Sequence, residues 1–496
     1  MKSLRLPSLL VQISIGVAST ATLMLAQAQV PLADQPVFSS VSVPGNVALA
    51  LSVEFPTAVS VAHTGNYSSA NTYLGYFDQN KCYLYKYDAD ETKRHFYPDG
   101  LASSRTCTGK WSGNFLNWAT MQTIDPFRWA LTGGYRSTDN ATETILEKAW
   151  ASASQGSETN FPHRTTTGST TIKGATPFDW SDFKMGVRNF GNQLRFTQTG
   201  SVTAAGAPTA YESGSTPAPA TVWTVSVRVK VCDSSAAAGG LESNCTKYPA
   251  GNYKPTGLIQ QYSEQIRFSA FGYLNDGAVA RDGGVLRAKQ KFVGPSQPVP
   301  GSTPVANALG EWDANNGVMI TNPNPLDAAA TLADFGVTVG NSGVMNYLNK
   351  FGQITKAYKT YDPVGELHYA AVRYFKNLGN VPEWSSMSTA SAATKTTWID
   401  GFPVITKWDD PIQYSCQKNF IIGIGDANTH ADRNLPGATG SSEPTKPAAV
   451  SSDTTVDALA ATNKVGALHG IADLGSKQPY GGCCTNNGAL MAGVAY

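Results

Sequence analysis

Short apolar runs, each bounded by glycine, proline or polar residues, recur along the chain and predict a mixed α/β fold. Residues 47–53 form one such run between Pro44-Gly45 and Pro56, and residues 419–426 contain a second. Unbroken apolar runs of this length are typical of strands that are buried on both faces of a parallel sheet. We therefore expect the two segments to lie side by side in one buried sheet.

Other segments alternate like strands or repeat like helices. Residues 222–231 alternate valine with other residues, which predicts one half-exposed strand with the valines on one face. The tyrosine-rich stretch 67–97 predicts strands and turns on the surface. Further strands are expected at 266–273 and 285–292, and helices at 114–131, 142–151, 343–361, 363–376 and 488–496.

The first 28 residues have the pattern of a secretory signal peptide. Lys2 and Arg5 precede an uncharged, mostly apolar segment at 9–25, and Ala26-Gln27-Ala28 is a small-x-small cleavage site. A membrane anchor is the alternative, and Gln12 and the serines and threonines of the segment disfavour it. No later stretch reaches the ~20 apolar residues that a transmembrane helix needs. We therefore expect an exported chain.

The composition agrees with an exported protein and argues against nucleic acid as a partner. The 496 residues include 37 Lys+Arg and 36 Asp+Glu, so 15% are charged and the net charge is +1. Ordinary soluble domains have roughly 25% charged residues. A balanced charge gives no general attraction for a polyanion. The hydrophobic share of 41% is enough to build a core.

Seven cysteines suit an oxidising compartment. Cys82 with Cys107, and Cys232 with Cys245, are close in sequence and are expected to form local disulfides. Cys416 is expected to pair with Cys483 or with Cys484, which leaves one thiol over. No spacing of cysteines and histidines fits a zinc site.

The search for catalytic motifs finds none. The sequence has no Walker A loop, no G-x-S-x-G elbow and no H-E-x-x-H helix. Ser52-Val53-Glu54 and Asp426 each follow an expected parallel strand, and ligands bind beyond the carboxyl ends of such strands. Oxygen ligands gathered there could hold Mg²⁺ or Ca²⁺. The alternative is that they cap helices or close turns.

Segments spread over most of the chain resemble the N-terminal half of the PilY-type family, the large type IV pilus biogenesis factors and tip-associated adhesins of Gram-negative bacteria. Their order and density carry the likeness, since no single segment would be enough. The segments are 46–58, 73–78, 110–121, 271–276, 281–287, 363–367 and 416–422.

The resemblance implies an α/β fold with a von Willebrand factor A-like central sheet, which has helices on both faces and carries β-rich and loop-rich insertions. After a signal peptide at 1–28, residues 29–151 would form the first part of this domain with the tyrosine-rich insertion. Residues 152–255 would be a loop-rich insertion with β-strands. Residues 256–496 would complete the domain and stop before the C-terminal propeller of the family.

The resemblance also points to a metal position that is altered here. A working A-domain site has Asp-x-Ser-x-Ser after its first strand, whereas this chain has Ser52-Val53-Glu54-Phe55-Pro56. Asp426 matches the later aspartate of such a site. We therefore expect Ser52, Glu54 and Asp426 to make a weak, degenerate site with poor or absent binding of Mg²⁺ or Ca²⁺, and no other cofactor.

By the same resemblance, the function is pilus assembly and surface adhesion through protein–protein contacts, without catalysis. The partners would be minor pilins, other pilus assembly proteins, and a host or abiotic surface. The location would be the periplasm, the outer-membrane surface or the pilus tip. The alternative is an exported carbohydrate-active hydrolase or a glycan-binding protein, because aromatic loops can stack on sugars and paired carboxylates can cleave glycosidic bonds.

Overall fold

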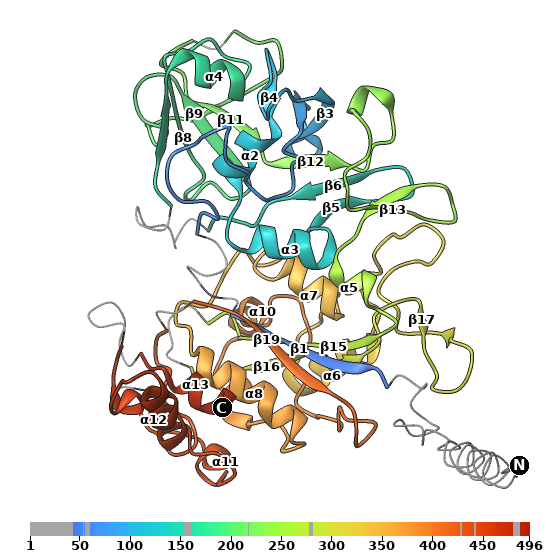
Figure 1. Cartoon of the computed structure of the whole chain (residues 1–496), viewed down its shortest axis with the longest axis vertical. Coiled ribbons are helices and arrows are strands. Elements are labelled where there is room, and N and C mark those ends of the chain that lie inside the picture. Colours follow the sequence, from blue (N-terminus) through green and yellow to red (C-terminus); the bar gives the residue numbers. More distant parts are fainter. Residues whose placement is uncertain are drawn as a thin grey trace, which may run out of the picture. The chain divides into compact units, whose positions relative to one another are not determined.

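The structure is a computed structural model (Figure 1). It describes residues 43–52, 54, 60–152, 161–216, 218–276, 281–426, 429–440, 443–479 and 487–496. Residues 44–299 and 303–496 belong to one compact unit. The expected signal peptide, together with Cys483 and Cys484, lies outside the described residues.

Strands and helices alternate irregularly along the chain. The strands are β1 (Gly45–Leu51), β2 (Lys81–Lys86), β3 (His95–Leu101), β4 (Trp111–Ser112), β5 (Arg136–Asp139), β6 (Thr144–Glu147), β7 (Arg164–Thr167), β8 (Asp182–Gly186), β9 (Gln193–Thr197), β10 (Thr209–Ala210), β11 (Trp223–Ser226), β12 (Arg228–Val231), β13 (Cys245–Lys247), β14 (Tyr253–Pro255), β15 (Ile266–Gly272), β16 (Val285–Lys291), β17 (Ser296–Gln297), β18 (Val305–Ala306) and β19 (Asn419–Ile424). The α-helices are α2 (Gly113–Thr120), α3 (Ile124–Thr132), α4 (Ser169–Ala175), α5 (Leu258–Gln261), α6 (Pro325–Phe335), α7 (Val344–Lys350), α8 (Val364–Phe375), α9 (Pro382–Ser385), α10 (Ala392–Ile399), α11 (Ala448–Ser451), α12 (Ala458–Leu468) and α13 (Leu490–Ala495).

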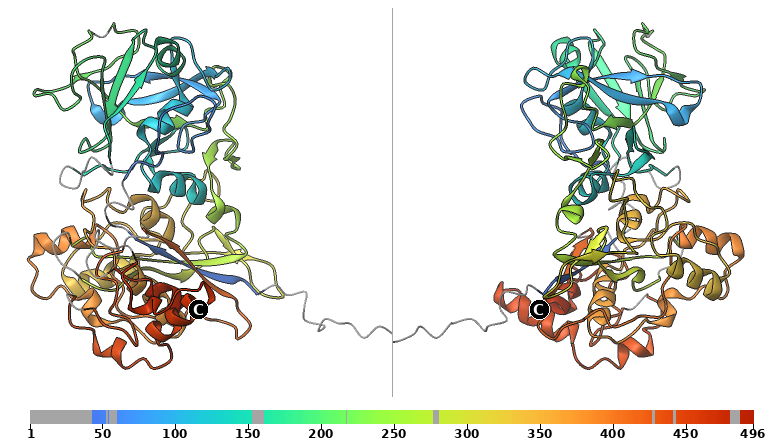
Figure 2. Two further views of the ribbon diagram at one scale, coloured as in Figure 1. Left: turned by 60° about the vertical axis from the view of Figure 1, so that its left-hand side comes forward. Right: turned by 90° about the vertical axis from the view of Figure 1, so that its right-hand side faces the viewer.

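Within the described part of the chain, a four-stranded sheet has the order β16-β15-β1-β19. The blue β1 lies between the yellow-green β15 and the orange β19, and it is parallel to both (Figures 1 and 2). Val47 faces Phe268 on one side and Phe420 on the other. The expectation that the two apolar runs lie side by side is confirmed.

The expected burial of the second run is wrong. β1 is buried from Asn46 onward, whereas Phe420 is 54% exposed and Ile422 is 44% exposed. β19 pairs with β1 alone among the described strands and is therefore an edge of the sheet. Apolar content predicted a strand here, but it carries no information about which strand has neighbours on both sides.

Helices cover both faces of this sheet. On β15, the ring of Phe271 lies 5.6 Å from that of Tyr374 on α8. A Cβ atom on the next residue, Gly272, would meet the hydroxyl of Tyr347 on α7 at 1.9 Å. Neighbouring residues of a strand point to opposite faces. α8 therefore packs on one face and α7 on the other.

Two further sheets within the described residues are built from the segment between β1 and β15. One has the order β4-β2-β3-β12-β6-β5 and the other has the order β10-β11-β9-β8-β7. The predicted strand at 222–231 is in fact two strands, because β11 belongs to the second sheet and β12 to the first. Its polar residues Ser226 and Arg228 are buried together with the valines, so it is not half-exposed.

The helix predicted at 142–151 is wrong, because its centre is strand β6. β6 pairs with β12 on one side and with β5 on the other, and all four of its residues are buried. The helix predicted at 114–131 divides into α2 and α3. The prediction at 363–376 agrees closely with α8, and α7 ends at Lys350, earlier than predicted.

The tyrosine-rich stretch is not mainly a surface feature. Tyr73, Tyr76, Tyr83 and Tyr85 are all at least 94% buried. Tyr85 packs on Phe96, and Phe96 in turn contacts Trp111, so the stretch contributes to an aromatic core. Tyrosine carries a large apolar ring with one polar end, and burial is favourable when that end finds a partner. The hydroxyl of Tyr83 accepts a hydrogen bond from the backbone N–H of Asp78.

Both short-range disulfides are present, Cys82–Cys107 and Cys232–Cys245. A buried ion pair connects the two disulfide regions, since Nζ of Lys81, the neighbour of Cys82, is 2.7 Å from Oε1 of Glu242 in the Cys232–Cys245 loop. Cys416 is exposed, and it forms no disulfide with a described cysteine. The cysteines expected to pair with it lie outside the described residues.

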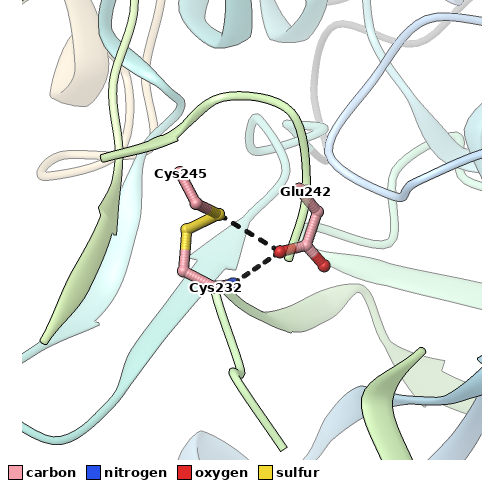
Figure 3. A group of neighbouring side chains, drawn as sticks. All are labelled: Cys232, Glu242 and Cys245. Atoms are coloured by element: carbon pink, nitrogen blue, oxygen red, sulfur yellow. Dashed lines mark hydrogen bonds between the residues drawn. A yellow bond between two sulfur atoms is a disulfide. The ribbon is translucent and has the colours of Figure 1, made fainter. Parts of the chain in front are cut away.

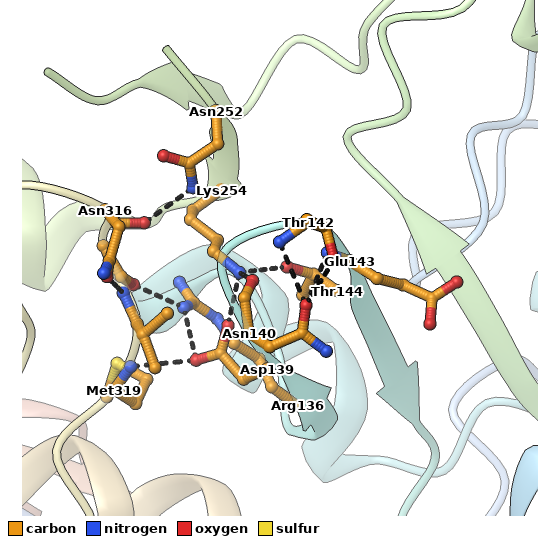
Figure 4. A network of polar contacts seen from close by, with 12 residues as sticks. Arg136, Asp139, Asn140, Thr142, Glu143, Thr144, Asn252, Lys254, Asn316 and Met319 are labelled. Atoms are coloured by element: carbon orange, nitrogen blue, oxygen red, sulfur yellow. Dashed lines mark hydrogen bonds and ion pairs between the residues drawn. The ribbon is translucent and has the colours of Figure 1, made fainter. Parts of the chain in front are cut away.

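A second buried group of charges joins β5, β14 and the loop at 313–319 (Figure 4). Asp139 accepts hydrogen bonds from Arg136, from Lys254 and from the backbone N–H of Met319, at 2.9, 2.7 and 2.9 Å. Arg136 also donates to the backbone oxygen of Gly317 at 2.8 Å. Each charge has an opposite charge and hydrogen bonds, as buried charges require. This network is therefore a structural one.

Candidate functional site

Oxygen-bearing side chains gather where the parallel strands of the four-stranded sheet end. The carboxyl ends of parallel strands lie at one edge, which is where α/β sheets bind ligands. Ser52 and Glu54 follow β1, Asp276 follows β15 and Asp426 follows β19. Asp362 stands just before α8, which packs on the same sheet. We use the name acidic edge for the site that these strand ends and their neighbours form: Ser52, Glu54, Asp282, Asp362, Glu366, Asp426, Asp432 and Glu443.

The sequence predicted three of these residues, Ser52, Glu54 and Asp426. The structure places them at the carboxyl ends of the neighbouring strands β1 and β19. The backbone N–H of Ser52 donates to the oxygen of Ile424 at 2.9 Å. Ser52 Oγ donates to Glu54 Oε1 at 3.4 Å, and both side chains are buried. Asp426 is half-buried two residues beyond Ile424.

Asp362 is a member of the site that the sequence analysis missed. Its Oδ1 lies 2.6 Å from Nδ1 of His430. Burial, followed by the negative charges of Asp426 and Asp432, raises the pKa of Asp362 to about 9. An acid placed directly before a proline at the start of a predicted helix was the available signal.

Asp432 and Glu366 form the inner part of the acidic edge. Asp432 Oδ1 accepts the backbone N–H of Gly365 in the first turn of α8 at 2.5 Å. Glu366 Oε1 accepts the backbone N–H of Asn434 at 2.8 Å, and Glu366 is fully buried. Burial raises the pKa of Asp432 to about 6, and burial followed by the charges of Asp432 and Asp282 raises the pKa of Glu366.

Asp282 and Glu443 complete the group. Asp282 Oδ2 accepts from Asn434 Nδ2 at 2.7 Å, and Glu443 Oε1 accepts the backbone N–H of Arg433 at 3.2 Å. Burial raises the pKa of Asp282 to about 6 and that of Glu443 to about 8. The sequence analysis treated Asp282 only as part of a matching segment and did not select Glu443.

Two cations of the same region, the buried Lys359 and the partly buried Arg281, are paired with another carboxylate, Asp276. Lys359 Nζ is 2.7 Å from Asp276 Oδ1, and Arg281 Nε is 2.5 Å from Asp276 Oδ2. Carboxylates that crowd together in a buried place cannot all be ionised without partners. The raised pKa values of Asp362 and Glu443 therefore mean that these two carboxyls retain protons near neutral pH.

The described carboxylates of the acidic edge are not arranged to coordinate a metal ion together. Among the described residues, three ligand atoms of His, Cys, Asp or Glu come within 4.8 Å of one another only at Cys232, Glu242 and Cys245 (Figure 3). The two sulfurs of that group are joined in a disulfide, so neither is a thiolate ligand. Glu242 accepts the backbone N–H of Cys232 at 2.8 Å and pairs with Lys81. Its role is to brace the disulfide loop.

Comparison with known proteins assigns the chain to a family. Residues 64–213 match the family model for the small alpha/beta domain of PilY1 homologs, and residues 280–488 match the model for their second domain. The chain belongs to the PilY1-type family of type IV pilus biogenesis factors. The resemblance inferred from the sequence is confirmed.

Two relatives from Xylella fastidiosa (strain Temecula1 / ATCC 700964), each called a type IV pilus biogenesis factor PilY1 homolog, are similar to this chain. One is 48% identical over 464 residues, which is 90% of this chain and 37% of the relative. The other is 27% identical over 403 residues, which is 74% of this chain and 26% of that relative. The chain thus spans about a third of the length of these relatives. Neither name favours the hydrolase alternative.

No solved structure matches the chain. Among the residues that the structure describes, no helix combines the length and the apolar character needed to cross a bilayer.

Proposed function

We propose that this chain acts in type IV pilus biogenesis as an exported protein that works through contacts with other proteins and performs no catalysis. The observation that carries the proposal is the 48% identity over 90% of the chain to a relative named as a pilus biogenesis factor. The finer part of the proposal is adhesion at the pilus tip or cell envelope. Minor pilins are the partners that we propose, together with other pilus assembly proteins.

One structural feature, the presence of two disulfides, supports a protein that works outside the cytoplasm. The disulfides Cys82–Cys107 and Cys232–Cys245 belong to an oxidising compartment. The family models match residues 64–213 and 280–488, so the family likeness is not limited to one segment. An export signal at residues 1–28 fits the same location.

We further propose that the four-stranded sheet is the A-like region that the resemblance implies. Its parallel strands, the helices on both faces and the position of Asp426 after β19 support this. The site would bind divalent cations poorly. Ser52 stands where an aspartate is expected, and Asp362 and Glu443 retain protons near neutral pH in place of a cation.

Deletion of the gene tests the proposal. Surface pili and twitching motility should decrease in the deletion strain and should return when the intact gene is supplied from a plasmid. Sheared surface protein, probed for the major pilin, gives the measurement. Unchanged piliation in the deletion strain would contradict the proposed role.

A matched arm of the same experiment tests export. A plasmid that encodes the chain without residues 1–28 should give the protein in the cytoplasm and should fail to restore pili. Restoration by this cytoplasmic form would mean that export is not needed, and it would remove the assignment to the envelope.

A further inference from the structure

Two neighbouring hollows flank Trp129 of α3. The first has a volume of about 320 Å³ and the second of about 530 Å³, and Trp129, Ser243 and Asn244 border both. Ligand pockets have volumes of roughly 300–1,000 Å³ and are lined by aromatic and apolar side chains with a few polar groups among them. We use the name Trp129 groove for the two hollows, which are bordered chiefly by the segments 73–80, 129–130, 241–248 and 255–261.

One wall of the Trp129 groove, the loop 73–80, is held in place by α2. Asn117 Nδ2 donates to the backbone oxygens of Tyr73 and Phe77 at 2.9 and 2.7 Å, and Asn117 Oδ1 accepts the backbone N–H of Phe77 at 3.0 Å. A Cβ atom on Gly75 would meet Asn117 Oδ1 at 2.4 Å, so the loop passes this side chain at a distance that only glycine allows. This wall therefore keeps one shape before any ligand arrives.

Another wall is the loop 241–244, which the second disulfide holds. Cys232–Cys245 closes this loop, and Glu242 within it pairs with Lys81 at 2.7 Å. A site that is rigid before binding loses less entropy when the ligand arrives. The disulfide and the ion pair therefore fix the shape of the groove as well as the local fold.

Several polar side chains that border the groove have unused hydrogen-bonding capacity. Gln79 Oε1 is buried and has no partner among the described residues. The side chains of Asn80, Ser243 and Asn244 make no hydrogen bond with a described residue, and Asn80 and Ser243 are exposed. A buried acceptor without a donor is unfavourable, so a ligand group that donates to Gln79 Oε1 is favoured. Amides both donate and accept, and hydroxyl groups do the same.

Aromatic rings give the groove its apolar surface. Trp129 is half-buried, so part of its indole faces the solvent. The other rings that border the groove include those of Tyr73, Tyr76, Phe77, Tyr248 and Trp312. The C–H groups on one side of a sugar ring contact an aromatic ring through dispersion and weak C–H interactions. The groove thus combines flat apolar surfaces with amide groups, which match the two kinds of contact that a sugar offers.

The groove carries little charge, and that charge is negative. Its described lining includes no lysine, arginine or histidine, and its two carboxylates are Asp78 and Glu242. Asp78 Oδ1 accepts the backbone N–H of Asn80 at 2.9 Å, and Glu242 is engaged by Lys81. An acidic ligand would lie beside like charges with no cation to pair with. Because Glu242 is engaged, the two carboxylates do not form an acid–base pair for cleaving a glycosidic bond.

We propose that the Trp129 groove binds a neutral oligosaccharide, with a sugar ring against Trp129 and sugar hydroxyl groups hydrogen-bonded to Gln79, Asn80 and Asn244. An uncharged peptide has similar polarity, but its donors and acceptors lie along a backbone. A sugar ring presents hydroxyl groups around its edge and an apolar face to the indole, and this arrangement matches the groove more closely. Such binding rests on the adhesive part of the proposed function, and it specifies an uncharged sugar chain as the surface that is recognised.

A glycan array tests the class of ligand. The purified mature chain is applied to immobilised neutral oligosaccharides of hexoses, pentoses and N-acetylhexosamines, next to uronic acid oligosaccharides of the same lengths. The chain should bind at least one of the neutral oligosaccharides and none of the uronic acid ones. The neutral oligosaccharide that gives the strongest signal is then titrated against the chain and its variants by calorimetry.

Two asparagine variants test the position of the site. Asn80→Ala and Asn244→Ala should each weaken binding by about two- to tenfold, which corresponds to the loss of one neutral hydrogen bond. Neither side chain bonds to a described residue, so the melting temperatures should not change. Gln413→Ala is the matched control, because its exposed amide also bonds to no described residue and lies outside the groove. Its affinity should equal that of the unchanged chain.

Binding of the folded chain to none of the neutral oligosaccharides would overturn the proposed sugar site, as would equal binding to the uronic acid oligosaccharides. An unchanged affinity of both asparagine variants would also overturn it. In cells, the double variant Asn80→Ala/Asn244→Ala should leave the amount of surface pili unchanged and should reduce attachment to beads coated with the bound oligosaccharide. Failure of the sugar site therefore leaves the role in pilus biogenesis standing, and that role is contradicted separately by unchanged piliation in the deletion strain.

Discussion

At the scale of single residues, two carboxyls of the acidic edge hold their protons at a higher pH than they would in the unfolded chain. Glu443 and Asp362 have pKa values raised to about 8 and about 9, chiefly by burial and then by neighbouring carboxylates. A carboxyl in the unfolded chain has lost its proton well below neutral pH. Folding near neutral pH therefore takes up protons at this site.

The first prediction is a loss of stability as the pH rises. The folded state holds more protons than the unfolded state above the ordinary pKa of Glu443, 4.5, until its folded pKa of about 8 is reached. Stability falls with pH wherever the folded state binds more protons. The contribution of Glu443 to the free energy of unfolding, taken as the difference between the unchanged chain and Glu443→Gln in urea unfolding at several pH values, should decrease between about pH 5 and about pH 8.

Glu443→Gln is the control for this dependence. Glutamine keeps the carbonyl that accepts the N–H of Arg433 and does not titrate. The stability of the unchanged chain relative to this variant should therefore fall between about pH 5 and about pH 8. A difference that stays constant or rises over this range would contradict the protonated state of Glu443.

The second prediction concerns divalent cations. Calorimetric titration of the mature chain with Mg²⁺ and with Ca²⁺ should give no micromolar binding, because the ligand atoms of the described residues are not gathered there and Asp362 and Glu443 retain protons near neutral pH. Micromolar affinity that is abolished by Asp426→Ala would show that the acidic edge closes around a cation.

The third prediction concerns the contribution of the buried Lys81–Glu242 ion pair to the free energy of unfolding. Glu242→Ala leaves the ammonium of Lys81 buried, at 2% exposure, and removes the acceptor of the Cys232 N–H. Loss of one partner of a buried pair costs about 3–5 kcal/mol. Urea unfolding should show a loss of this size. Asp99→Ala, which breaks the more exposed pair with Lys110, should cost at most about 1 kcal/mol, and equal losses would contradict the argument.

At the scale of elements, the pattern of apolar residues predicted the limits of several strands and of one helix correctly. β1, β15 and β16 lie within one or two residues of the predicted limits, and α8 agrees equally well. β6 was predicted as a helix because its short run is buried on both faces, and a run without a polar face fits either period. Its strand conformation is set by pairing with β12, which is distant in sequence.

The fourth prediction concerns how much each of the two disulfides stabilises the fold. Cys82 and Cys107 are 25 residues apart, so their bond should stabilise the fold by about 3.5 kcal/mol through the entropy of the unfolded chain. The double variant Cys82→Ser/Cys107→Ser should unfold at lower urea concentration by a corresponding amount. The bond Cys232–Cys245 closes a shorter loop, and its removal should cost slightly less, about 3 kcal/mol. No change on removing either bond would contradict this account.

At the scale of the whole molecule, the family likeness and the pairing of β1 with β19 could be predicted from the sequence. Most of the acidic edge could not. Ser52, Glu54 and Asp426 follow predicted strands, so their place could be inferred. Asp432 and Glu443 lie in the segment beyond β19, where no periodic pattern guides a prediction. Only the folded chain brings these loop residues against the first turn of α8.

The central claim is that the chain works by binding other components of the pilus system, and capture from living cells tests it most directly. A tagged chain, cross-linked in the source bacterium and purified from the envelope fraction, should enrich pilins and pilus assembly proteins over an exported control protein of similar size. Mass spectrometry gives the comparison. An envelope fraction that contains the chain but enriches no pilus protein would contradict the account.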